Sequence, residues 1–170
     1  MRALAPIVIV SLITGCGPSA TTTPSESLLA AGAPCPVTTA PPTTVTPPPS
    51  VGTGPNPTLT FTAGPGNVLY GNDALIVILP NDGTLHPSDP ARGLPAGVKF
   101  PWWRGARGDL TVATRRLDAN TTPQAADVPG GYGDTGFQVS GLNFPAPGCW
   151  QVTGTISGRA VTFVVNVVGR

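Results

Sequence analysis

At 170 residues the chain has room for one domain and accessory segments. Only 10% of the residues are charged and the formal net charge is +1. The sequence therefore lacks the excess of basic residues with which a protein binds nucleic acid or anionic lipid. One His and one Lys leave few groups for acid–base or nucleophilic catalysis, and we expect no enzyme, no cofactor and no metal site.

Residues 1–15 have the layout of a secretory signal peptide. Arg2 precedes an apolar run from Ala3 to Ile13, which is about half of the roughly twenty residues that a spanning helix needs. The next residues, Ile13-Thr14-Gly15-Cys16, resemble the lipobox of bacterial lipoproteins. The resemblance implies cleavage after Gly15, lipid on Cys16 and a place on the extracytoplasmic face of the cell membrane. An ordinary signal peptide followed by an incidental cysteine is the alternative.

Residues 16–58 hold the lipidation site and a Pro/Thr-rich linker. Its runs, such as Pro47-Pro48-Pro49, exclude a helix and an interior strand, and they favour polyproline II at about 3.1 Å per residue. We expect an extended stalk with a reach on the order of 100 Å. A plain disordered tail without a required length is the alternative.

Residues 59–170 are predicted to form an all-β domain, an immunoglobulin-like β-sandwich of about seven strands. Short segments of β-branched residues, several alternating with period two, recur between Gly, Pro, Asn and Asp. Ser157-Gly158 separates the last two strands. The expected strands include Leu59–Thr62, Ala74–Leu79, Asp109–Thr114, Phe137–Leu142, a strand through Trp150 and Val152, and Ala160–Val168.

A long loop is expected from Pro80 to Trp103, because five prolines interrupt this stretch and prolines cannot donate to a strand ladder. Loops of this kind on a rigid sandwich often carry binding sites.

Cys35 and Cys149 are the cysteines that remain once Cys16 is lipidated. Two cysteines in an exported protein most often form a disulfide, and this one would close a loop of more than a hundred residues. Free thiols are the alternative. A metal site is disfavoured because no His or third Cys lies nearby in sequence.

Trp102, Trp103, Arg104 and Arg107 are the candidate binding residues. Adjacent strand residues face opposite ways, so one Trp is expected in the core and the other exposed beside the arginines, where it could stack on a sugar or an aromatic group. The alternative is that both Trp residues are buried, or that the second one covers the edge of the sandwich. The arginines at 104, 107, 115 and 116 are expected to form surface ion pairs with the aspartates at 109, 118, 127 and 134. A cluster that binds an anion is the alternative.

The Gly-rich segment 130–136 lacks the Gly-Lys-Ser/Thr ending of a phosphate-binding loop, so we expect a tight loop with Tyr132 or Phe137 packed on the core. A hydrolase would have to use His86 with Ser88, or Lys99 with a serine, and nothing in the sequence places these groups together.

Several motifs together are similar to a family of small bacterial secreted proteins and lipoproteins to which no activity is assigned. The resemblance covers Cys35 to the end, although the Pro/Thr repeat after Cys35 is more degenerate than the family pattern. Its last hairpin also resembles that of immunoglobulin-like domains. The motifs are Cys35-Pro36-Val37-Thr38, Lys99-Phe100-Pro101-Trp102-Trp103-Arg104-Gly105, Arg116-Leu117-Asp118, the segment from Gly130 to Gln138, and the segment from Phe144 to Gly154.

These features predict a membrane-anchored envelope lipoprotein whose non-catalytic β-sandwich binds an envelope polymer or protein. A structural or accessory subunit of an envelope complex is the alternative, and a hydrolase that uses His86 is a weaker one.

Overall fold

The computed structural model describes residues 28–30, 32–39, 61–87 and 97–169, and these residues contain nine β-strands and no helix. The predicted signal peptide, the predicted lipidation site Cys16 and most of the predicted linker lie outside the described residues. The strands in chain order are β1 Asn67–Gly71, β2 Leu75–Pro80, β3 Thr84–Leu85, β4 Val98–Arg104, β5 Thr111–Arg116, β6 Gln124–Ala125, β7 Gly136–Leu142, β8 Gly148–Ile156 and β9 Arg159–Val167.

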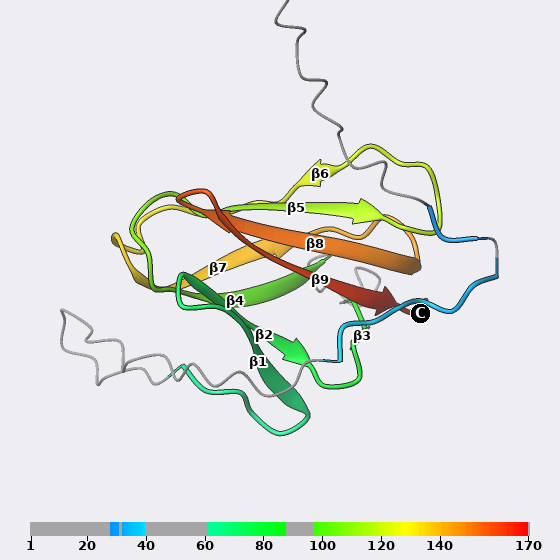
Figure 1. Ribbon diagram of the computed structural model, residues 1–170, viewed down its shortest axis with the longest axis horizontal. Coiled ribbons are helices and arrows are strands. Elements are labelled where there is room, and N and C mark those ends of the chain that lie inside the picture. The colour runs from blue at the N-terminus through cyan, green and yellow to red at the C-terminus, as the bar shows by residue number, and fades with distance from the viewer. Residues whose placement is uncertain (1–27, 31, 40–60, 88–96, 170) are drawn as a thin grey trace, which may run out of the picture.

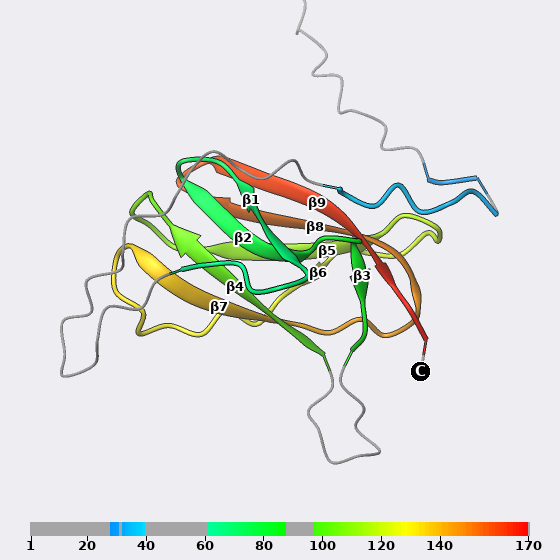
Figure 2. The same ribbon diagram turned by 90° about the horizontal axis from the view of Figure 1, so that it is seen from below.

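The strands form two sheets, of four and five strands, in an arrangement consistent with a β-sandwich (Figures 1 and 2). The first sheet has the order β1-β2-β4-β7 and the second the order β3-β9-β8-β5-β6. Neighbouring strands are antiparallel except β3, which runs parallel to β9. The chain therefore passes from the first sheet into the second between β2 and β3.

The main core lies between the sheets because β8 and β9 alternate with period two. Along β9, Val161, Phe163, Val165 and Val167 are buried while the residues between them are exposed or half-buried. Phe163 meets Phe100 and Trp102 of β4 at ring distances of 5.5 and 6.1 Å. Each fully buried side chain of this size contributes roughly 1.5–3 kcal/mol. The shared ring contacts join the two sheets.

Strand β2 is buried on both faces, which accounts for its continuous apolar sequence. Leu75, Val77 and Leu79 belong to the main core. Ile76 and Ile78 face the other way and belong to a second group of apolar side chains, which we call the outer cluster. Its buried members are Phe61, Ile76 and Trp103, and Leu69, Ile78 and Phe137 pack against them. A strand with two buried faces loses the alternation that a half-exposed strand shows.

The free edge of β9 is closed by partners from outside its sheet ladder. Such edges otherwise invite pairing with another chain. The partners are the Asn72 side-chain amide, which donates to the Ala160 carbonyl (3.2 Å), the Tyr70 hydroxyl, which donates to the Thr162 carbonyl (3.1 Å), the Thr38 N–H, which donates to the Val164 carbonyl (2.9 Å), and the Gly83 carbonyl, which accepts from the Asn166 N–H (2.8 Å).

Most predicted strands are confirmed within one or two residues, namely Ala74–Leu79, Asp109–Thr114, Phe137–Leu142 and the final pair. The turn between β8 and β9 is also confirmed. Ser157 and Gly158 have φ values of 48° and 73°, which is the backbone of a two-residue type I′ hairpin.

The prediction of a loop throughout Pro80–Trp103 is wrong, because β3 and most of β4 lie within it. Pro101 sits in β4 opposite Val139 of β7. It is tolerated because the pairing of β4 with β2 stops at Trp102, which leaves Pro101 at a local sheet edge where its missing N–H breaks no ladder.

Two further differences concern the start of the domain. Phe61 and Thr62, the described half of the predicted strand Leu59–Thr62, lie outside any strand. Strand β1 was not predicted, although Val68-Leu69-Tyr70 followed by Gly71-Asn72-Asp73 is a short β-forming run before a turn.

Candidate binding surface at the loop end

Four connections meet at one end of the sandwich, which we call the loop end. They are the turn 72–74 after β1, the loop 105–110 after β4, the Gly-rich loop 130–136 before β7 and the turn 157–158 after β8. Strand registers place them together, since Leu75 pairs with Arg104, Arg104 pairs with Gly136, and Ile156 pairs with Arg159. Figure 1 shows the β8–β9 turn at the end of the molecule opposite the C-terminus.

Arg104 holds two of these loops together. Its side chain is buried, with 3% of the residue exposed, at the last position of β4. The guanidinium donates hydrogen bonds to the carbonyls of Gly133 (2.7 Å), Tyr132 (3.2 Å) and, more weakly, Gly108 (3.4 Å). A guanidinium is suited to this task because it carries five donors in one plane. The Gly-rich loop is therefore pinned through its backbone.

The buried positive charge of Arg104 is stabilised by carboxylates that it does not contact directly. Burial lowers the pKa of the guanidinium from its ordinary value, and the carboxylates of Asp134 and Asp109 act in the opposite direction. Its Nε atom has no hydrogen-bond partner. Arg104 thus pairs with carbonyls and not with a carboxylate, in contrast to the predicted surface ion pair.

Backbone contacts tie the remaining loops to this network. The N–H groups of Gly105 and Ala106 both donate to the carbonyl of Ala74, at 2.9 and 3.3 Å. A side chain at position 105 would collide with the Asp73 carbonyl, at 2.0 Å from a Cβ. The Ser157 hydroxyl donates to the carbonyl of Arg107. Loops held in this way need little ordering when a partner binds.

The rim of the loop end carries exposed charges of both signs. Arg107 and Asp134 approach to 3.7 Å, but their side chains are 84% and 76% exposed, so this pair adds little stability. Arg159 and Asp73 form a second exposed pair across the sheets. The hydrogen bond from Arg159 lowers the pKa of the Asp73 carboxyl. These four side chains remain available to a partner.

Both tryptophans of the predicted site are buried, so the expectation of an exposed indole is wrong. Trp102 is fully buried in the main core and Trp103 is 8% exposed. The two do face opposite sides of β4, but Trp103 is covered by the outer cluster with Phe61 and Ile76. The alternative that both are buried is the arrangement observed.

The Gly-rich loop places its aromatic residue as expected. Tyr132 packs edge-on against Phe137 at 5.9 Å, and Phe137 in turn contacts Phe61 at 6.3 Å. The loop therefore covers the outer cluster, while three of its glycines, at 131, 133 and 136, have positive φ values.

The other predicted residues lie away from the loop end. The Cys35–Cys149 disulfide is confirmed, with 5.4 Å between the two Cα atoms. Arg116 forms the expected ion pair with Asp118 at 2.6 Å. Arg115 donates to the Gln151 side chain. His86 and Lys99 are exposed. Ser88, the serine considered beside His86, is outside the described residues.

Sequence reasoning named Arg104 and Arg107 but missed the residues that organise the loops around them. Asn72 accepts hydrogen bonds from the N–H groups of Ala74 and Leu75 and shapes the first turn. Ser157 ties the last turn to the loop after β4. The Asn72-Asp73 pair was a readable turn signal, whereas nothing local marks Ser157 as a contact of residue 107.

Comparisons of the chain with protein-family models, with curated proteins and with solved structures find no match. Within the described ranges there is no helix of the length and apolarity needed to cross a bilayer. The same ranges hold no group of three or more His, Cys, Asp or Glu side chains placed to bind a metal.

Proposed function

We propose that this protein is a lipid-anchored envelope lipoprotein whose non-catalytic sandwich binds an envelope protein or polymer through the loop end. The observation that carries the proposal is the Arg104 network, which holds the exposed pair Arg107 and Asp134 on preorganised loops. Lipid on Cys16 and a place on the extracytoplasmic face of the membrane are parts of the proposal.

We further propose that the sandwich is immunoglobulin-like. The support is its strand order: a strand of the first sheet, β2, is followed by a short strand, β3, that pairs parallel with the last strand. Strands β5, β8 and β9 are then neighbours in the second sheet, as the strands C, F and G are in immunoglobulin domains. Binding loops in that architecture gather at one end of the sandwich.

The anchor is tested by intact-mass analysis of the protein from native membranes. Acyl groups on an N-terminal Cys16 are expected. An unmodified Cys16, or a chain that begins elsewhere, contradicts the proposed anchor.

Binding is tested by cross-linking on intact cells and affinity isolation of the full-length protein, together with co-sedimentation on isolated cell-wall sacculi. Arg107→Asp reverses an exposed charge, and we expect recovery of the partner to fall at least about fivefold, or about 1 kcal/mol. Lys99→Asp is the matched control, since Lys99 is an exposed cation near the other end of β4. Equal losses in both variants, or no loss in either, contradict a binding surface at the loop end.

A further inference from the structure

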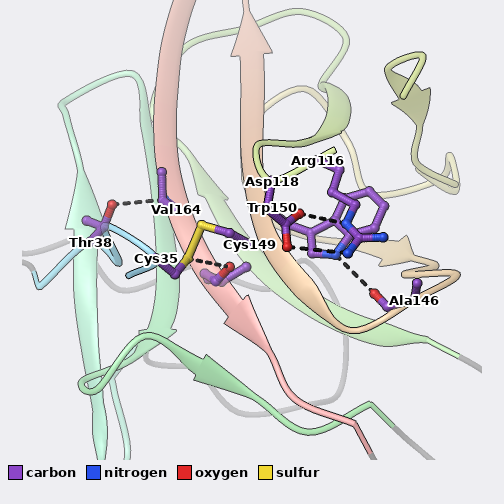
Figure 3. Close-up of a disulfide and its surroundings, with 9 residues drawn as sticks. Cys35, Thr38, Arg116, Asp118, Ala146, Cys149, Trp150 and Val164 are labelled. Atoms are coloured by element: carbon purple, nitrogen blue, oxygen red, sulfur yellow. Dashed lines mark hydrogen bonds and ion pairs between the residues drawn. A yellow bond between two sulfur atoms is a disulfide. The ribbon is translucent and has the colours of Figure 1, made fainter. Parts of the chain in front are cut away.

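A segment of the predicted linker crosses the end of the sandwich opposite the loop end. We call this segment, the described residues 28–30 and 32–39, the strap. The Leu29 N–H donates to the carbonyl of Leu117 just after β5 (2.8 Å). Cys35 is joined to Cys149 at the start of β8. Thr38 then bonds the free edge of β9. The strap thus contacts, in turn, the residue that follows β5, then β8 and then β9, which are neighbours in one sheet. Figure 1 shows the strap along this end of the sheet, and Figure 3 shows its contacts with Cys149 and Val164.

The contact between Thr38 and β9 is reciprocal. The Thr38 N–H donates to the Val164 carbonyl, and the Val164 N–H donates to the Thr38 hydroxyl, both at 2.9 Å. Figure 3 shows Thr38 on Val164 beside the disulfide. The adjacent Val37 lies over Gly83, where a Cβ would come within 2.6 Å of the valine. Gly83 also has a positive φ of 65°. Both this backbone conformation and the close approach of Val37 favour glycine at this position.

These contacts change where the tether joins the domain. We infer that the strap is the attachment point of the sandwich, so that only the residues between Cys16 and Leu29 space it from the membrane. Residues 40–60 follow the strap and lie outside the covalent path from the lipid to the disulfide. The inference rests on the proposed anchor at Cys16.

The difference in reach is large. From Cys16 to Leu29 is 13 residue steps, which fully extended span at most about 45 Å. From Cys16 to Phe61, the start of the sandwich without the strap, is 45 steps and at most about 155 Å. The strap therefore shortens the maximum distance between the lipid anchor and the sandwich about 3.5-fold. Only the part of residues 16–58 that precedes the strap acts as a spacer.

The strap also sets which end of the sandwich is distal. Cys149 lies at the start of β8 and Ile156 at its end, seven residues and about 23 Å apart. Attachment at Cys149 places the loop end, with Arg107 and Asp134, on the side away from the attachment. A partner beyond the domain would thus meet the loops first.

The test is site-specific proteolysis of the full-length protein in washed, opened membranes. A protease recognition sequence is inserted between Ser50 and Val51, after the strap. Following cleavage without reductant, we expect the sandwich to stay in the membrane pellet, and addition of a dithiol reductant to release it. Release without reductant would overturn the inference, and so would retention after both cleavage and reduction, because the attachment would then not run through the disulfide.

Two controls separate this result from the proposed anchor. The same recognition sequence between Ser19 and Ala20 cuts before the strap, and cleavage there should release the sandwich with or without reductant. The uncut Cys16→Ser variant should leave the pellet. If Cys16→Ser stays with the membranes, the lipid anchor fails, whereas the position of the disulfide is still read from whether the two fragments cut after Ser50 remain joined in a non-reducing gel.

Discussion

Removal of the Cys35–Cys149 disulfide is the perturbation for which the structure gives the clearest magnitude. The bond spans 114 residues of sequence. In the chain-entropy model a closed loop of this length constrains the unfolded chain by about 4.8 kcal/mol at 25 °C. A typical domain has only about 5–15 kcal/mol of unfolding free energy. We therefore expect Cys35→Ala/Cys149→Ala to lose most of the stability of a marginal domain.

The assay is equilibrium denaturant unfolding of the purified protein, followed by tryptophan fluorescence. The Cys double variant and the reduced wild-type protein should agree with each other and should fall about 3–5 kcal/mol below the oxidised protein. Thr38→Val is the matched control, because it removes one strap hydrogen bond and keeps the disulfide, with an expected loss of about 1 kcal/mol. If the double variant loses no more than Thr38→Val, the loop-closure reasoning is refuted.

Three other substitutions test the core and one ion pair. Ser140→Ala leaves the buried Trp102 N–H, now 2.9 Å from the serine hydroxyl, without its acceptor, and should lower the unfolding free energy by about 1–3 kcal/mol; a loss under about 0.5 kcal/mol contradicts this. Gly154→Ala places a Cβ 2.6 Å from the Trp102 ring and should cost about 1–3 kcal/mol and alter the near-ultraviolet spectrum, whereas a stabilised variant would show that the ring moves freely. Asp118→Asn should lose less than about 1 kcal/mol at pH 6, since the pair with Arg116 is partly exposed. The hydrogen bond from Arg116 lowers the pKa of Asp118 below its ordinary 3.8, so the stability that the pair adds is present above that pH and disappears as the pH falls through the folded value. The difference in unfolding free energy between the variant and the wild type should therefore shrink as the pH is lowered below 3.8, and a difference that stays constant would refute the assignment.

At the loop end, the local sequence identified residues of the candidate site but not their roles. Arg104 and Arg107 stood out because basic residues follow two aromatic ones. Their actual roles differ, since Arg104 is buried on the carbonyls of Tyr132 and Gly133 while Arg107 is exposed. The contact between Arg104 and Gly133 joins residues 29 apart, and no pattern within either segment contains it.

Local pattern was sufficient for β2, β5, β7 and the β8–β9 hairpin, because period-two alternation, β-branched residues and turn residues act over a few neighbours. It was also sufficient for the disulfide, because a pair of cysteines in a chain predicted to be exported most often forms a disulfide.

Tertiary structure decided the rest. Pro101 can lie in β4 because the pairing of β4 with β2 covers only Trp102–Arg104 and so begins one residue after the proline. Trp103 is buried because Phe61 and Ile76, from other parts of the chain, pack around it on that face of the sheet. The strap belongs to a Pro/Thr-rich sequence that predicts a free stalk. Its position depends on Val164, Cys149 and Leu117, which are more than 80 residues away and offer a sheet edge and a thiol that become neighbours only after the sandwich has closed.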